Sequence, residues 1–120
     1  MQDFRKLRVW QKAHQLSLDI YKATKRFPKD EIYGLTSQIR RATVSIGANI
    51  AEGSGKDSNI EFKRFLSIAM GSSSELENHL LLARDLEYLD KTEYDRFQAD
   101  LVEVRKMLNV FIHKLRTINS

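Results

Sequence analysis

The sequence predicts an all-α protein, folded as an up-down-up-down antiparallel four-helix bundle. No segment of the 120 residues shows the sustained two-residue alternation of apolar and polar side chains that marks a strand. Pro28 is the sole proline, and four of the five glycines lie between residues 34 and 55, so helix breakers are confined to few places. The segments between the breaks are long and their connections short, which makes consecutive helices antiparallel neighbours.

The first two helices are predicted at about residues 7–26 and 30–52. The first ends at the sequence FPKDE. The second begins in that acidic turn, where Asp30 and Glu31 suit the positive end of a helix dipole. We expect Gly53 to end the second helix in a left-handed conformation.

The third and fourth helices are predicted at about residues 58–88 and 91–118. Each begins with a capping box, SNIE at Ser58 and DKTE at Asp90. The stretch MGSSSELE from Met70 could split the third helix, but apolar residues stay on one face through it, which favours a continuous helix. The whole chain, 1–120, is predicted to be one domain.

The fourth helix carries the clearest periodicity. Its apolar residues are spaced alternately by three and four, which is the heptad pattern of a helix packed along one seam. They are Tyr94, Phe97, Leu101, Val104, Leu108, Phe111, Leu115 and Ile118.

The first two helices are more apolar than a lone bundle requires. The apolar arc of the first spans about 180°, wider than the roughly 100° stripe that one core needs. In the second, a core face of Ile32, Leu35, Ile39, Ala42, Ile46 and Ile50 is backed by Tyr33, Val44, Ala48 and Ala51, with Gly47 close by. We therefore expect a homo-oligomer whose subunit contacts use the second helix and part of the first.

Charge is unevenly distributed along the chain. The net charge is +4, yet residues 1–27 hold seven basic and two acidic side chains, so the remainder sums to −1. This asymmetry favours an anionic partner, nucleic acid above all, although a Lys-rich solvated helix face would give the same pattern. The candidate phosphate-binding residues are Arg5, Lys6, Arg8, Lys12, Lys22, Arg26, Arg40 and Arg41.

No motif in the sequence matches a catalytic or nucleotide-binding pattern in full. The sequence GSGK before Asp57 resembles a phosphate-binding loop, but Ile50 stands where the first glycine belongs and Asp57 where a Ser or Thr belongs. There is no cysteine, and the three histidines fall on different predicted helices. We therefore expect no catalytic residues, no metal site and no cofactor.

Two polar residues near the end of the second helix need partners. Asn49 falls beside the core face, where an unpaired amide is costly. Glu52 lies in the last helical turn, the unfavourable end for a negative charge. With Gly53, they form a structural signature that we expect to fix the turn and the helix register.

Several segments resemble one known family. They are FRKLRVWQKAHQL, FPKDEIYGLTSQIRRATVSIGANIAEGSG, EFKRFLSIAMGSSSELENHL and YLD, and NIAEG is the most specific part. They resemble the bacterial four-helix-bundle proteins encoded in intervening sequences of large-subunit (23S) ribosomal RNA genes. The resemblance implies a ring-like homopentamer and supplies no catalytic residues.

Two functions remain open from the sequence. The first is a non-enzymatic oligomer that binds RNA or DNA through its basic surface by phosphate contacts. The second is a protein-interaction scaffold or accessory protein whose charge serves only solubility. The charged start MQDFRKLRVW lacks the apolar core of a signal peptide, and no run is long enough to span a membrane, so we expect a cytoplasmic protein.

Overall fold

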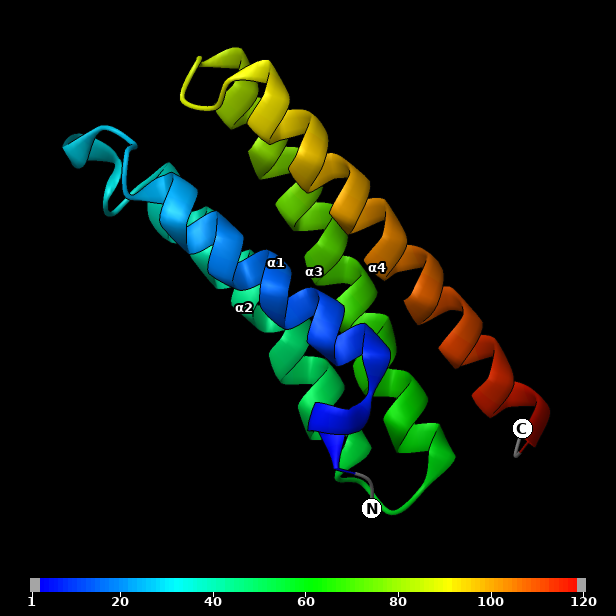
Figure 1. Cartoon of the computed structure of the whole chain (residues 1–120). Coiled ribbons are helices and arrows are strands. Elements are labelled where there is room, and N and C mark those ends of the chain that lie inside the picture. The colour runs from blue at the N-terminus through cyan, green and yellow to red at the C-terminus, as the bar shows by residue number, and fades with distance from the viewer. Residues whose placement is uncertain (1–2, 119–120) are drawn as a thin grey trace.

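The computed structural model describes residues 3–118, and side chains up to residue 116. The described residues form helices and connections without a strand, which confirms the predicted all-α class. Consecutive long helices run antiparallel to one another (Figure 1). The helices are α1 (Arg8–Thr24), α2 (Leu35–Ser54), α3 (Asn59–Asp85) and α4 (Lys91–Ile118), with short 3-10 turns η1 (Phe4–Lys6) and η2 (Lys29–Glu31).

The helices pack in a closed order, α1 on α2, α2 on α3, α3 on α4, and α4 back on α1. The molecule is elongated, with principal extents of 46 × 23 × 21 Å. Both hairpins of the chain, α1–α2 and α3–α4, contribute buried residues to one core. One groove lies between α1 and α4, and another lies between α1 and α2.

The core is apolar and is built from one face of each helix. Most of the predicted seam of α4 is buried, from Phe97 to Leu108 and again at Leu115, whereas Tyr94 and Phe111 are half-buried. Ile112, which the predicted seam lacks, is buried beside Phe111. The Ile118 side chain lies outside the described residues. The largest fully buried side chains are Phe97, Leu16, Ile20, Ile39, Ile46, Ile50, Leu66, Leu76, Leu80, Leu101, Leu108 and Val104.

The connection between α1 and α2 is longer than the sequence indicated. Residues 29–31 form a 3-10 turn, and α2 begins at Leu35 and not at residue 30. The Glu31 carboxylate still serves the helix N-terminus, since it accepts a hydrogen bond from the Leu35 N–H at 3.0 Å. Ile32, expected in the core, precedes the helix and is 48% exposed.

Gly53 does not have the conformation predicted for it. Among the described residues no glycine has a positive φ, and α2 continues through Gly53 to Ser54. Its role is close packing on α3, because a Cβ at Gly53 would lie 2.8 Å from Phe65 Cβ and 2.9 Å from Phe62 Cδ1. The missing side chain therefore lets the end of α2 approach the start of α3.

Both predicted N-caps form. The Ser58 hydroxyl accepts from the Glu61 N–H at 3.1 Å, and the Asp90 carboxylate accepts from the Glu93 N–H at 2.7 Å. α3 is continuous through the Gly71–Ser74 stretch and ends at Asp85. It is closed by Glu87, which has a φ of 64° although it is not a glycine.

Candidate functional site

α1 presents three different strips along its length. One strip is buried in the core and includes Val9, Ala13 and Ile20. A basic strip contains Arg8, Lys12 and Lys22, of which Arg8 lines a groove shared with α4, and an apolar strip lies toward α2. The helix thus separates a charged surface from an apolar one.

Three of the predicted phosphate-binding residues are engaged within the chain. Arg26 forms an ion pair with Glu93 of α4. The Arg40 guanidinium donates from Nε to the Thr24 hydroxyl at 2.9 Å and lies over the Tyr21 ring, 4.7 Å from its centroid. These contacts make Arg26 and Arg40 structural residues that join separate helices.

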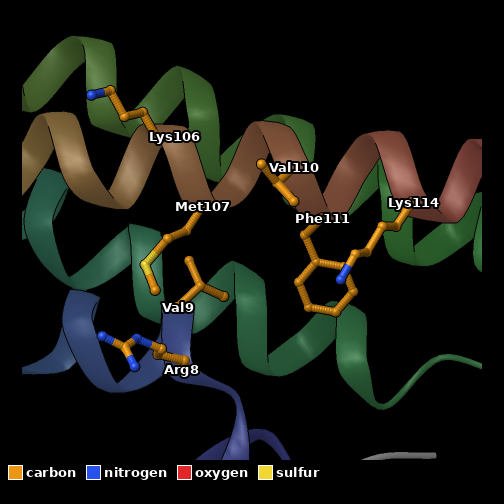
Figure 2. Close-up of a pocket in the computed structure, with 7 residues that line it drawn as sticks. All are labelled: Arg8, Val9, Lys106, Met107, Val110, Phe111 and Lys114. Carbon is orange, nitrogen blue, oxygen red and sulfur yellow. The ribbon is translucent and has the colours of Figure 1, made fainter.

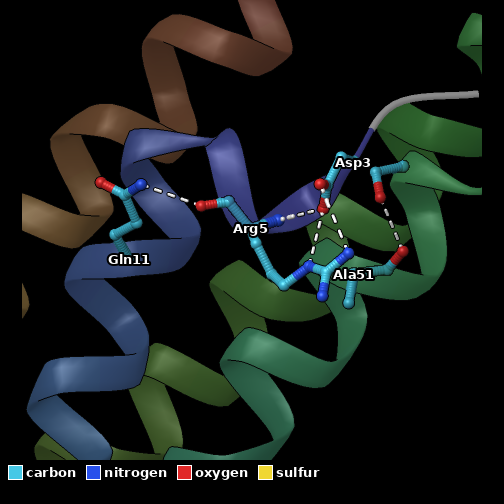
Figure 3. A network of polar contacts seen from close by, with 5 residues as sticks. Asp3, Arg5, Gln11 and Ala51 are labelled. Carbon is cyan, nitrogen blue, oxygen red and sulfur yellow. Dashed lines mark hydrogen bonds and ion pairs between the residues drawn. The ribbon is translucent and has the colours of Figure 1, made fainter.

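Arg5 is the third engaged residue. Its side chain pairs with Asp3 at 3.0 Å, and its backbone carbonyl accepts from Gln11 Nε2 at 2.8 Å (Figure 3). The side-chain hydrogen bond from Arg5 lowers the pKa of Asp3 below its ordinary value of 3.8, and the same bond raises the pKa of Arg5. The Arg5 guanidinium therefore already has a carboxylate partner, with which a ligand phosphate would compete.

The other five candidates keep their charges unpaired. Within residues 3–116, no hydrogen bond or ion pair reaches Lys6, Arg8, Lys12, Lys22 or Arg41. Arg8, Lys12 and Lys22 share the basic strip of α1, while Arg41 is on α2, apart from them. The only acidic residue along that strip is Asp19, which accepts from Gln15 Nε2 at 3.1 Å.

A groove of about 370 Å³ lies where the basic strip meets α4. Arg8 and Val9 line it from α1, and Figure 2 shows Val9 pointing toward α4 while Arg8 lies at the edge of the groove. The α4 residues are Lys106, Met107, Val110, Phe111 and Lys114. Sequence reasoning missed Lys106 and Lys114, because the register of α4 against α1 is set by tertiary packing and carries no local signal.

A second groove, of about 410 Å³, lies between α1 and α2. The rings of Trp10 and His14 stack at its edge, with centroids 4.6 Å apart. Leu18 and Val44 are each nearly half exposed beside them. The remaining lining is Ser17, Tyr21, Gly47, Ala48 and Ala51. These residues are the apolar surface of the first two helices that the sequence predicted for subunit contact.

The expected polar signature is only partly satisfied. Asn49 Nδ2 donates to the Ser45 carbonyl at 2.8 Å and to its hydroxyl at 3.0 Å. The Ser45 hydroxyl also bonds Ser72 of α3 at 2.8 Å, so Asn49 belongs to a network that fixes α2 against α3. Glu52 is exposed, and its side chain has no hydrogen bond or ion pair within the described residues, although its charge helps to raise the pKa of Arg64 on α3.

The described residues contain no group of three or more His, Asp or Glu side chains placed to hold a metal ion. The nearest approach is the Glu75–His79 pair on α3, at 3.4 Å. No helix in the described part of the chain is long and apolar enough to cross a membrane.

The fold and its surfaces define a small all-α protein of four antiparallel helices, with a basic strip and an apolar face on its first helix. The family model for the 23S rRNA-intervening sequence protein matches residues 5–110, and the chain belongs to this family.

A similar solved structure is a crystal structure from Bacteroides thetaiotaomicron VPI-5482, a protein of unknown function from the S23 ribosomal protein family. It is 29% identical to this chain with a TM-score of 0.81, and the match covers 88% of this chain and 95% of that one. No curated protein matches the sequence. Neither the family nor the solved neighbour indicates a catalytic activity.

Proposed function

We propose that the protein is a cytoplasmic, non-enzymatic homo-oligomer that binds nucleic acid through phosphate contacts. The observation that carries the proposal is the strip of Arg8, Lys12 and Lys22 on α1, whose charges have no partner within the described chain. Cations on one face of a helix attract phosphates electrostatically, and such binding requires no particular base sequence.

Homo-oligomerisation is supported by the groove between α1 and α2. Val44 is 47% exposed there, and Gly47, Ala48 and Ala51 are small enough for another helix to approach closely. Burying this face against a second copy removes apolar surface from water. Repetition around a ring, a pentamer by family resemblance, would multiply the modest charge of each chain into a field that attracts RNA or DNA.

The proposal is tested by fluorescence anisotropy of a labelled RNA hairpin and a labelled DNA duplex, titrated with the protein at several salt concentrations. Affinity should fall log-linearly with salt. Replacing Arg8, Lys12 and Lys22 by Gln should reduce the slope for duplex DNA by about 2–3, since each lost phosphate contact removes about 0.9. The control replaces Lys25, Lys29 and Lys63, which lie off the strip, by Gln.

A second candidate function is a protein-interaction scaffold. It is favoured by the ion pairs of Arg5 and Arg26 and by the contacts of Arg40, because they leave fewer cations for a nucleic acid. Absence of RNA and DNA binding at low salt would reject the nucleic-acid proposal and leave the scaffold. Equal losses of nucleic-acid affinity in the strip variant and in its control would show that binding depends on net charge and not on the strip.

A further inference from the structure

The groove between α1 and α4 combines an apolar floor with a cationic rim. Its floor is formed by Val9, Met107, Val110 and Phe111, and Figure 2 shows Val9 and Met107 pointing toward one another across it. Val110 is 58% exposed, a large fraction for an apolar side chain in the middle of a helix. This floor has no cover within the described chain.

The rim of the groove carries one sign of charge. Arg8 stands on the α1 side, and Lys106 and Lys114 stand on the α4 side. No carboxylate lines the groove, and neither Arg8 nor Lys106 has a hydrogen bond or ion pair within the described residues. Charge complementarity therefore selects an occupant that presents carboxylates at its edges and apolar groups at its centre.

The dimensions of the groove suit a helix. Lys106 and Lys114 are eight residues apart on α4, which corresponds to about 12 Å along the helix axis and about two turns. An amphipathic helix places apolar residues at i, i+3, i+4 and i+7 over that same length. Its flanking positions would then stand opposite the cations of the rim.

We propose that this groove binds an acidic amphipathic helix of a partner protein. Such a helix covers the apolar floor and pairs its carboxylates with Arg8 and Lys106, in the helix-in-groove mode of recognition. A phosphate backbone satisfies the rim but gains little from Val110 and Met107, because its groups there are charged and hydrated. The groove shares Arg8 with the proposed phosphate-binding strip, but the proposal does not rest on nucleic-acid binding, since Val110 and Lys106 are outside the phosphate-binding set.

The probe is a yeast-displayed library of helices about 15 residues long, a length at which helices begin to be stable in water. Apolar residues are fixed at i, i+3, i+4 and i+7, and the other positions vary among Glu, Lys, Gln, Ser and Ala. The library is selected on the full-length protein. Selected peptides are then measured against V110D and K106E, with V102D as the control, because Val102 is also an exposed valine of α4 but lies outside the groove.

The selected peptides should be richer in Glu than in Lys. V110D and K106E should each lower the affinity for these peptides by about tenfold or more, while V102D should leave it unchanged. Peptides with Glu changed to Lys should regain binding to K106E. Circular dichroism verifies that each variant is folded, and NMR shifts of the wild-type protein locate the bound peptide independently of any variant. Lys-rich peptides, absence of selection, or binding unchanged by V110D would overturn the proposal. So would RNA binding, without peptide binding, that V110D abolishes.

Discussion

The Glu31 carboxylate accepts a hydrogen bond from the Tyr88 hydroxyl at 2.9 Å, across 57 residues of sequence. The bond joins the connection between α1 and α2 to the connection between α3 and α4, and the rings of Tyr88 and Phe27 pack beside it, with centroids 5.4 Å apart. Hydrogen bonds from the Leu35 N–H and from Tyr88 lower the pKa of Glu31 below its ordinary value of 4.5. One carboxylate thus begins α2 and fastens one end of the bundle.

This relationship predicts a stability that depends on pH. Because the pKa of Glu31 is lowered by folding, its contribution is present above about pH 4.5 and is lost as the pH falls through the lowered pKa. The free energy of unfolding of wild type should therefore exceed that of E31Q at about pH 6, and the difference should shrink as the pH decreases to about 3. Urea midpoints across this range measure the effect, and parallel curves for the two proteins would contradict it.

The same bond acts in the opposite sense at alkaline pH. The hydrogen bond to Glu31 raises the pKa of Tyr88 above its ordinary value of 10.0, so its contribution is complete below that pH and is lost as the pH rises through the raised pKa. Y88F should be less stable than wild type at neutral pH and should show a smaller further loss in alkali. Spectrophotometric titration of the tyrosines provides the independent measurement, and a difference between the two proteins that stays constant into alkali would be evidence against the bond.

Two glycines in helices should respond oppositely to alanine. G53A should lower the free energy of unfolding by about 1–2 kcal/mol, because the new Cβ overpacks against Phe62 and Phe65. G71A, with nothing within 4 Å of the new Cβ, should raise it by about 0.5–1 kcal/mol through helix propensity. Equilibrium unfolding in urea compares the pair, and a neutral G53A would rule out close packing as the role of this glycine.

Glu87 offers a stabilising substitution. Its φ of 64° is a left-handed conformation that is costly for residues with a Cβ. The Tyr88 N–H bonds to the Ala83 carbonyl and the Glu87 N–H to the Arg84 carbonyl, which is the pattern that usually holds a glycine at this position. E87G should therefore raise the free energy of unfolding by about 0.5–1 kcal/mol. E87A is the control, because it keeps the Cβ. Equal stability of E87G and E87A would show that backbone strain at residue 87 does not limit the stability of the protein.

The apolar face between α1 and α2 predicts a variant with altered assembly. V44E places a charge in the middle of that face and should shift the protein toward monomers in sedimentation velocity. L82E is the matched control, since Leu82 is 46% exposed, much like Val44, but lies outside this groove. An unchanged oligomer in V44E, or a monomeric wild type, would exclude this face as the subunit contact.

The ion pairs predict which arginines matter for nucleic acid. R26Q removes a side chain already paired with Glu93 and should leave affinity almost unchanged. K22Q, one turn away on the same strip, removes an unpaired charge and should weaken binding and reduce the salt slope for duplex DNA by about 0.9. Equal effects of the two variants in the anisotropy assay would show that the pairing of Arg26 opens on binding.

Features that depend on local sequence were predictable. The caps at Ser58 and Asp90 form as expected, because a capping hydrogen bond spans only three residues. The seam of α4 was readable from spacing alone, since its buried residues repeat with the period of the helix. The start of α2 was misplaced, because the turn before it is held by Glu31 and Tyr88, and Tyr88 is 57 residues further along the chain.

The sequence by itself determined the all-α class, the seam of α4, and the presence of a basic and an apolar strip on the first helix. Only the tertiary structure decided that Gly53 is a packing glycine, that Arg26 is paired with Glu93, and that Lys106 stands across a groove from Arg8. The physical reason is the distance along the chain over which each kind of interaction acts. Helix formation and periodicity depend on neighbours a few residues away, whereas the fate of a charge depends on which side chains distant segments bring beside it.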